Sequence, residues 1–432
     1  MTLLLAAGRT VITPEPGHPM GGYLARQGVA TGVHDDLEAT LVWLSTEDDP
    51  GVLWVTLDAL ATDVPLTRAL VAGVAEETGV PAERVLVCAS HTHSGPDGWT
   101  GSIHPGLPAE REPELVRRLT EQIRAAARQL RPQRTPVTAQ WHAGAAGAVG
   151  TNRHRHDGPH DGSVGVLALR HPDGAAAALL FDYASHPTVL SAENLAWSAD
   201  WPGATRRGLA ALAPVSAFLQ GAAGDASSRF VRRGRGHAEV TALGSRLAES
   251  ITRLLPFGQP VEGPVRLTRT ALRLPHRTLP SLAECGRLRQ DAESGWRKLL
   301  SRGENDPAVR IARTRYEGTL MLTTLAAAGL PGEAEVPITV VSLGEVAWLH
   351  TPFELFASIG LRIRDASPFA HTRVIGYTDG YLGYLPDRDA YRDGLYESYI
   401  ALVEQGAAEV LVERCVELLR AHRDRRAVVN TV

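Results

Sequence analysis

Short apolar runs recur along the chain, and each is followed directly by a polar or glycine-rich turn. The run at residues 84–89, Arg-Val-Leu-Val-Cys-Ala, is almost continuously apolar, which is typical of a strand buried on both faces of an α/β sheet. Open α/β sheets bind ligands at the C-terminal ends of their strands, so we expect the turns after these runs to meet at one pocket. Four further strands of this kind are predicted at 178–184, 215–219, 346–349 and 373–376.

Segments with helical spacing of apolar residues separate these strands. Alternation of strands and helices is the signature of an α/β layer architecture. We therefore predict an α/β fold in which a mixed β-sheet is flanked by helices, and we expect residues 1–432 to form a single domain. Helices are predicted at 66–78, 112–129, 240–255, near 354–365 and at 407–422, with one more strand at 336–343.

The pattern changes between about residues 279 and 329, where the chain becomes polar and favours helix. Two apolar faces with helical spacing follow one another in this stretch, which predicts a helical hairpin inserted into the sheet domain. The first face holds Leu282, Leu288, Trp296, Leu299 and Leu300, and the second holds Val309, Ala312, Tyr316 and Leu320.

Composition limits the classes of partner. With 44% hydrophobic residues the chain can bury a large core. The formal net charge is -4 and no long basic run occurs, so there is no electrostatic case for binding nucleic acid or an anionic membrane surface. We expect a small-molecule partner, and the sequence does not indicate the oligomeric state.

The cellular location is predicted from three features. The first residues lack a positively charged segment and a long apolar core, so they do not resemble a signal peptide. No stretch reaches the roughly 18 apolar residues of a membrane span. The three cysteines, Cys88, Cys285 and Cys415, are odd in number and far apart, which favours reduced thiols. We therefore expect a cytoplasmic protein.

The candidate chemistry lies directly after the run at 84–89, in His91-Thr92-His93-Ser94-Gly95. A His-X-His pair at a strand end suits a metal ion. Metallo-β-lactamase-like hydrolases carry His-X-His-X-Asp-His, but here Ser94 and Gly95 follow the second histidine. Amidohydrolase barrels require a lysine, and Lys298, the one lysine of the chain, lies in the predicted hairpin. Neither of these two classes fits.

The chain lacks the usual motifs of a serine nucleophile and of a phosphate loop. Ser94, Ser185 and Ser227 lie in predicted turns, but no Gly-X-Ser-X-Gly sequence occurs, so an α/β-hydrolase loses its main support. No Gly-Lys-Ser/Thr occurs either, which excludes a Walker-type phosphate loop.

Two polar loops are interpreted as solvated surface. Glycine, proline and aspartate surround His154, His156 and His160, and such loops are mostly exposed. The second loop carries a cluster of arginines, for which binding of an anionic substrate group is the alternative. These arginines are Arg229, Arg232, Arg233 and Arg235.

Several motifs together resemble the catalytic domain of the neutral ceramidases, in the family's order and over nearly the whole chain. The family's C-terminal immunoglobulin-like domain is not expected, because the chain ends one helix after the last motif. The motifs are residues 11–23, Gly32-Val33-His34-Asp35, Ser90 to Pro96, Thr151-Asn152-Arg153, Gln220 to Ser227, and Tyr384 with Tyr396.

The resemblance implies a zinc ion and its ligands. By motif, Zn2+ would be held by His91, His186, Glu354 and Tyr384, the last as a phenolate. Nitrogen and oxygen ligands are those of catalytic zinc sites, which leave room for water. His93 would stand beside the metal and transfer protons or orient a ligand.

The resemblance also implies roles around the metal. Arg153 and Tyr396 would hydrogen-bond the substrate amide or its oxyanion, and Ser227 matches a serine proposed as nucleophile in the family. Asp200 and Asp225 are expected only to support turns or ligands. The sequence leaves open whether Ser227 attacks the substrate or positions it.

Two departures from the family limit the inference about substrate. Ser228-Arg229 follow Ser227 where the ceramidases have Pro-Asn, and His186 is followed by Pro187-Thr188 rather than Gly/Cys-Thr-Ser. We therefore expect a zinc-dependent amidohydrolase that uses metal-activated water on a small N-acyl amide rather than on ceramide. Ester or lactone hydrolysis, amide-forming acyl transfer or cyclisation, and a non-catalytic zinc-containing binding protein are the alternatives.

Overall fold

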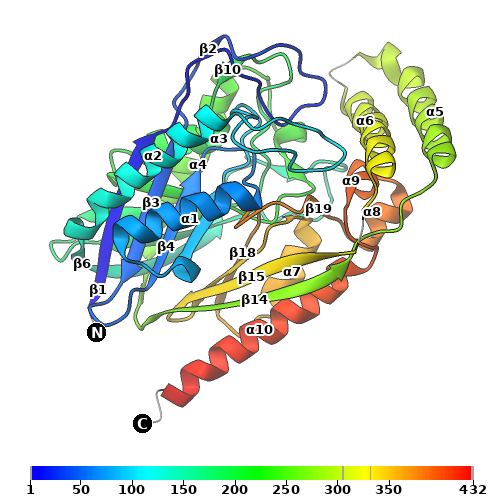
Figure 1. The fold of residues 1–432 in the computed structure, drawn as a ribbon. Coiled ribbons are helices and arrows are strands. Elements are labelled where there is room, and N and C mark those ends of the chain that lie inside the picture. The colour runs from blue at the N-terminus through cyan, green and yellow to red at the C-terminus, as the bar shows by residue number, and fades with distance from the viewer. Residues whose placement is uncertain (1, 304–305, 331, 430–432) are drawn as a thin grey trace.

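The structure is a computed structural model, and it describes residues 2–303, 306–330 and 332–429. Within these residues the strands form one large sheet, one smaller sheet and three short two-stranded ladders (Figure 1). The large sheet is mixed, because β11 and β9 pair in parallel, as do β4 and β5, while most other neighbours are antiparallel. Its order is β11 (Val215–Gln220), β9 (Ala176–Tyr183), β8 (Ser163–Arg170), β6 (Thr135–Ala145), β1 (Leu3–Val11), β3 (Glu38–Ser45), β4 (Val52–Leu57) and β5 (Val85–Ala89), and β13 (Gln259–Val261) pairs with β6.

The smaller sheet comes from the C-terminal part of the chain. It contains β14 (Val265–Pro275), β15 (Glu333–Leu343), β16 (Val346–His350) and β18 (His371–Ile375), in that order. The short ladders join β2 (Gly32–Val33) to β10 (Ala196–Trp197), β7 (Thr151–Asn152) to β12 (Ala226–Ser227), and β17 (Glu354–Leu355) to β19 (Tyr384–Leu385).

The α-helices of the described residues begin and end at recognisable signals. The Asp63 side chain accepts a hydrogen bond from the Leu66 amide at the start of the first helix, and Gly79 ends it with φ 78°. The helices are α1 (Val64–Thr78), α2 (Pro113–Leu130), α3 (Asp200–Leu209), α4 (His237–Leu254), α5 (Leu282–Leu299), α6 (Pro307–Ala328), α7 (Ala357–Asp365), α8 (Arg388–Asp393), α9 (Tyr396–Ile400) and α10 (Ala407–Val429).

The two sheets pack face to face, and helices cover their outer faces. Trp348 of the smaller sheet lies between Trp54 and Trp141 of the larger, with ring centroids 6.1 and 5.7 Å apart. α1 and α2 cover one half of the larger sheet's outer face, and α3 and α4 cover the other half. α7 and α10 cover the smaller sheet (Figure 1). The result is four layers, helix, sheet, sheet and helix.

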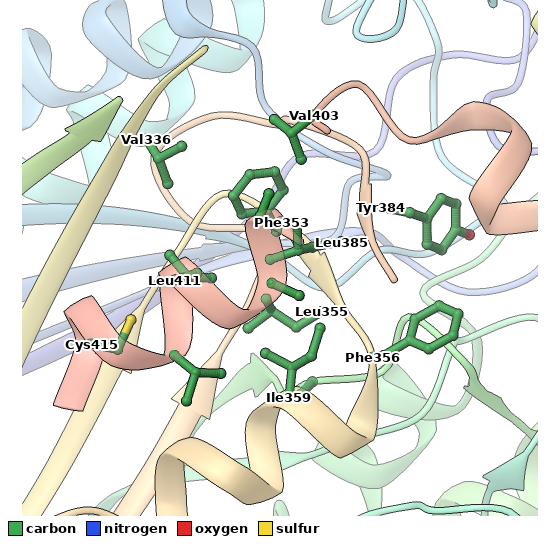
Figure 2. Close-up of a cluster of buried hydrophobic side chains, with 14 of the residues drawn as sticks. Val336, Phe353, Leu355, Phe356, Ile359, Tyr384, Leu385, Val403, Leu411 and Cys415 are labelled. Atoms are coloured by element: carbon green, nitrogen blue, oxygen red, sulfur yellow. The ribbon is translucent and has the colours of Figure 1, made fainter. Parts of the chain in front are cut away.

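The core beneath α7 and α10 reaches the loops at the strand ends. Phe353, Leu355 and Phe356 enter it from the segment that follows β16, and all three are buried. Tyr384 lies at the edge of the same cluster, with its hydroxyl directed away from the apolar side chains (Figure 2). The core thus fixes the backbone on both sides of Glu354.

The expected turns do converge. The backbone after β18 bridges two other strand ends, because Ile375 pairs with Gly221 after β11, and Thr378 pairs with Cys88 at the end of β5. In the described part of the chain, four residues other than glycine have left-handed backbone, with φ between 53° and 67°. They are His91 after β5, Tyr377 and Asp379 after β18, and Asp200 at the start of α3.

The predicted α/β architecture of sheet and flanking helices is confirmed. α5 and α6 form the expected hairpin between the paired strands β14 and β15, and Trp296 stacks on Tyr316 at 5.5 Å. One boundary was wrong. Glu354 does not begin a helix but pairs with Tyr384 in the parallel β17–β19 ladder, and α7 starts at Ala357.

Candidate metal centre

Three imidazoles meet where these strands end. His91 and His93 follow β5 and His186 follows β9, and one nitrogen of each lies within 4.8 Å of the others. Oε2 of Glu354 is 3.2 Å from Nε2 of His91 and 2.9 Å from Nε2 of His186. His91, His186 and Glu354 are almost completely buried. Imidazole nitrogen and carboxylate oxygen are the donors that zinc accepts, so these residues could hold a metal ion.

Backbone carbonyls fix the tautomers of two of the imidazoles. Nδ1 of His91 donates to the Leu60 carbonyl at 2.7 Å, and Nδ1 of His186 donates to the Ala223 carbonyl at 2.7 Å. Nε2 of each ring therefore carries a lone pair toward the carboxylate of Glu354. Lone pairs facing an anion repel unless a cation lies between them, and a carbonyl on the remote nitrogen is the usual support of a metal-binding histidine. The donor set thus fits a metal ion.

Glu354 is held by two tyrosines that the sequence motifs did not indicate. The Tyr377 hydroxyl donates to Oε2 at 3.2 Å, and the Tyr381 hydroxyl donates to Oε1. Burial opposes ionisation of Glu354, but the neighbouring imidazoles hold its pKa well below its usual range. The pKa of His186 is lowered to about 4 by burial and by Arg153. A neutral imidazole beside an ionised carboxylate is the protonation state that a metal requires.

His93 differs from the other two histidines. Its Nε2 lies 3.3 Å from Nε2 of His91, but its Nδ1 is buried and has no hydrogen-bond partner among the described residues. The tautomer is therefore not fixed by the backbone. Gly22 packs against the ring, and a Cβ added there would lie 2.5 Å from Cγ of His93. Gly22 also has φ 98°, which favours glycine.

Tyr384 and Arg153 lie on the cavity side of the cluster. The Tyr384 hydroxyl is 3.2 Å from Nε2 of His186, and the Arg153 guanidinium lies over the Tyr384 ring at 5.3 Å. Burial raises the pKa of Tyr384 well above its usual range, so a cation nearby is needed to make it a phenolate. Its hydroxyl is in reach of His186, one of the residues that the motifs assigned to the metal with it.

Arg153 is held by a carboxylate that the sequence motifs missed. Its Nε donates to Oε1 of Glu397 at 2.7 Å, and Nε2 of His154 lies 2.9 Å from the same oxygen. Glu397 is fully buried and lies 244 residues away in the sequence. His154 therefore does not lie in solvent, contrary to the interpretation of its loop. His156 is exposed and His160 is partly buried, and neither takes part in this contact.

Asp225 and Asp200 support the turns, as expected. Oδ2 of Asp225 accepts from Asn152 at 2.8 Å, and its backbone carbonyl accepts from the Arg153 amide at 2.6 Å. Oδ2 of Asp200 accepts from the amides of Val189 and Leu190 at 3.1 and 3.2 Å. These contacts order the segments that carry Arg153 and His186.

A cavity of about 220 Å³ opens in front of the cluster. It is bounded by the turns after β9 and β12 and by the α5–α6 hairpin. His91 and Glu354 lie behind its wall. The sequence-predicted residues that face it are His93, Arg153, His186, Ser227, Tyr384 and Tyr396.

Ser227 and Tyr396 make few contacts of their own. The Ser227 Oγ accepts a hydrogen bond from the Arg229 amide at 3.3 Å, and no histidine is among its hydrogen-bond partners in the described residues. The Tyr396 hydroxyl lies 3.5 Å from Sδ of Met321 on α6, and its ring is 5.9 Å from the Tyr384 ring. Both side chains are available to a molecule in the cavity.

Sequence comparison gives no match, because no family model and no curated protein matches the chain. Solved structures do match. The neutral ceramidase from Pseudomonas aeruginosa superposes with a TM-score of 0.76 at 18% identity, covering 98% of this chain and 75% of that one. A ceramidase complexed with C2 gives 0.77 at 18% identity, covering 98% and 76%.

The chain has the neutral ceramidase fold. This confirms the architecture that the motif resemblance implied. The roles of individual residues are not given by similarity at this identity, so they depend on the geometry described above. Among the described residues of this ceramidase-like chain, no helix has the length and apolar content that crossing a bilayer requires.

Proposed function

We propose that the protein is a zinc-dependent hydrolase that cleaves the amide bond of a small N-acyl compound. One observation carries the proposal: Nε2 of His91 and of His186 face the same buried oxygen of Glu354, at the wall of a cavity that also holds Arg153. A structural zinc site is closed by its protein ligands, so it does not need an arginine such as Arg153 beside it in a cavity. Similarity of fold to ceramidases, which are named for an amide-cleaving activity, supports the same class of reaction.

His91, His186, Glu354 and Tyr384 would hold the zinc ion. When bound, zinc supplies a Lewis acid that polarises a carbonyl and lowers the pKa of water to about 7. Tyr377 and Tyr381 donate hydrogen bonds to the two oxygens of Glu354, and such bonds favour the ionised form of a carboxylate. The tyrosines thus keep the negative charge where the metal needs it.

Arg153 and Tyr396 would bind the amide carbonyl oxygen. The pKa of Arg153 is well above its usual range, because Glu397 and Tyr384 outweigh the effect of burial. A fixed guanidinium donor in a buried site stabilises negative charge as it develops on that oxygen. Tyr396 can also donate its hydroxyl proton to that oxygen, because in the described residues the hydroxyl is hydrogen-bonded to the weak acceptor Sδ of Met321.

His93 would accept a proton from the attacking water and transfer it during the reaction. Its ring faces the cavity, and its Nδ1 lacks the carbonyl partner that fixes His91 and His186. Burial and the two neighbouring imidazoles hold the pKa of His93 well below its usual range, so the ring is neutral and able to accept a proton. It can then deliver that proton to the leaving amine.

A small substrate rather than ceramide fits the residues that line the site. Ser228-Arg229 replace Pro-Asn after Ser227, so a charged side chain lies where the ceramidases have none. The aromatic content of the chain is 6%, which offers little surface for a long-chain lipid.

Release of the acyl group from a panel of compounds tests the proposal. The panel contains N-octanoyl amines and long-chain ceramide in detergent, assayed with zinc-loaded protein. We expect octanoate release from the small amides at a kcat/KM above that for ceramide, and loss of release in Glu354→Gln. No release from any amide by the zinc-loaded protein, or faster turnover of ceramide, would refute the proposal.

A further inference from the structure

The cavity has an excess of basic side chains in its lining. Six arginines line it against three glutamates. Arg229, Arg232 and Arg235 follow β12, whereas Arg310 and Arg313 come from α6 of the inserted hairpin. The loop that the sequence suggested to be solvated thus contributes to the wall of the cavity, and the hairpin brings two further arginines to it.

Four of these arginines have no carboxylate partner in the part of the chain that the structure describes. Arg229, Arg232, Arg235 and Arg310 form no ion pair within 4.0 Å, and the guanidinium groups of Arg229, Arg232 and Arg310 each donate to a backbone carbonyl. Nη1 of Arg229 donates to the Arg153 carbonyl at 2.9 Å, Nη2 of Arg310 donates to the Arg229 carbonyl at 3.1 Å, and Arg232 donates to the Thr188 carbonyl.

The three glutamates of the cavity are already engaged. Glu397 binds Arg153, Glu317 pairs with Arg313 at 3.1 Å, and the Glu193 carboxylate accepts from the Ser191 hydroxyl. Nε of Arg310 is buried and has no hydrogen-bond partner among the described residues. The positive charge on this wall is therefore left for a molecule that enters from outside.

The electrostatics of the wall agree with this geometry. Burial, followed by repulsion from Arg153 and Arg310, lowers the pKa of Arg229 to about 9. Burial and the charges of Arg232 and Arg235 lower the pKa of Arg310 to about 10. Partly buried charges of one sign are costly unless an opposite charge joins them.

We propose that the substrate carries an anionic oxygen group, a carboxylate or a phosphate, which is bound by Arg229, Arg232, Arg235 and Arg310. Guanidinium groups bind both anions through paired hydrogen bonds. The Arg229 guanidinium donates to the backbone carbonyl of Arg153. An anionic group bound by Arg229 would therefore lie close to the substrate amide at Arg153 and the imidazoles. This proposal rests on the proposed function, and it makes the substrate an acidic N-acyl amide.

Apolar side chains of the hairpin complete the recognition surface. Trp296, Leu300 and Val309 line the cavity beside the arginines. They offer an apolar surface to the uncharged part of the substrate. An amphiphilic molecule with one anionic end matches this combination.

Three compounds that each contain one amide test the proposal. N-octanoylglycine bears a carboxylate, the phosphate monoester of N-octanoylethanolamine bears a phosphate, and N-octanoylethanolamine is neutral. We expect kcat/KM for octanoate release to be at least about 10-fold higher for one or both anionic compounds than for the neutral one. The better of the two anionic compounds identifies the anionic group.

Variants connect the preference to the arginines. Arg310→Gln should lower the ratio of anionic to neutral kcat/KM by about 10-fold, and Arg235→Gln should change it in the same direction. The matched control is Arg297→Gln on α5, whose side chain pairs with Glu293 and is 67% exposed outside the cavity. This control should leave the ratio unchanged.

The outcomes separate this inference from the proposed function. Hydrolysis of all three compounds with equal kcat/KM would overturn the anionic subsite but not the proposed amidase activity. A ratio of anionic to neutral kcat/KM that is unaltered in both Arg310→Gln and Arg235→Gln would do the same. If no compound is cleaved, calorimetry with the same compounds decides. Tighter binding of an anionic compound that Arg310→Gln weakens supports the subsite, and equal binding of all three overturns it.

Discussion

At His91 and His186, the ring nitrogen that faces Glu354 is selected by a carbonyl on the far side of each ring. The hydrogen bonds to Leu60 and Ala223 fix the proton on Nδ1, so neither ring can donate to the carboxylate without becoming charged. The low pKa of His186, about 4, makes that charge unfavourable at neutral pH. A metal ion bound between them would resolve the conflict between the lone pairs and the anion.

Gly22 sets the position of His93, and its replacement should show this. Gly22→Ala places a methyl group 2.5 Å from Cγ of His93, and a shift of about 1 Å in a proton-transfer group can cost about 100-fold in activity. We expect kcat/KM for N-octanoyl substrates to fall by roughly that factor.

The control for this prediction is Gly17→Ala. Gly17 has a similarly left-handed φ of 114°, but a Cβ there would meet nothing within 4 Å. Both variants bear the cost of the backbone conformation, and only Gly22→Ala moves the histidine. Equal activity of the two variants, with equal melting temperatures, would remove Gly22 from the account.

Ser227 distinguishes two mechanisms. If activated water attacks the amide, Ser227→Ala loses one positioning contact and should reduce kcat by about 10- to 1000-fold. If Ser227 attacks, an acyl-enzyme must form and the variant should lose essentially all catalysis. We expect the smaller loss, because in the described residues no histidine side chain is hydrogen-bonded to the Ser227 hydroxyl. Detection of an octanoyl adduct on Ser227 by mass spectrometry during turnover would contradict it.

At the level of elements, the site depends on pairings between segments far apart in sequence. β17 and β19 place Glu354 beside Tyr384, and β12 with β7 places Ser227 beside Thr151, two residues before Arg153. Two-residue ladders of this kind have little stability alone. They are held because the sheets and the core around Phe353 and Leu355 fix both partners.

The α1–α2 pair offers a test of stability that is remote from the site. Glu77 on α1 accepts hydrogen bonds from Arg128 and Arg124 on α2, which lower its pKa to about 2. A carboxylate with a depressed folded-state pKa stabilises the fold above its unfolded pKa of about 4.5. That contribution is lost as the pH falls from 4.5 toward 2.

Glu77→Gln should therefore be less stable than the wild type at pH 7, and the difference should shrink at pH 3.5. Urea unfolding at the two pH values measures it. Glu76→Gln is the control, because Glu76 is 66% exposed and pairs with Arg124 alone, and it should lose less stability at pH 7. A difference for Glu77→Gln that is constant with pH would contradict the prediction.

At the scale of the whole molecule, the sequence predicted the architecture because its signals are local. Continuous apolar runs and helical spacing depend on neighbouring residues, and they located the α/β layers and the hairpin at 279–329. The packing of two sheets against each other was not predictable, since Trp54 and Trp348 meet across almost 300 residues. Neither position differs from an ordinary buried strand residue in the sequence.

The candidate site was predictable where motifs are short and missed where partners are distant. His91 and His93 are separated by one residue, and the motif resemblance supplied His186, Glu354 and Tyr384. Glu397 was missed because nothing near it in the sequence indicates Arg153. The loop from Arg229 was interpreted as solvated because the hairpin that contacts it through Arg310 is 81 residues away. The roles of the individual residues stay predictions.

Metal content measured together with activity tests the central claim most directly. Purified wild-type protein, His91→Ala and His186→Ala are compared by elemental analysis and by octanoate release, before and after chelation and zinc addition. We predict about one zinc per chain in the wild type, activity that chelation abolishes and zinc restores, and loss of both metal and activity in the two variants. A wild type that hydrolyses amides without metal, or variants that keep full metal occupancy, would contradict the account.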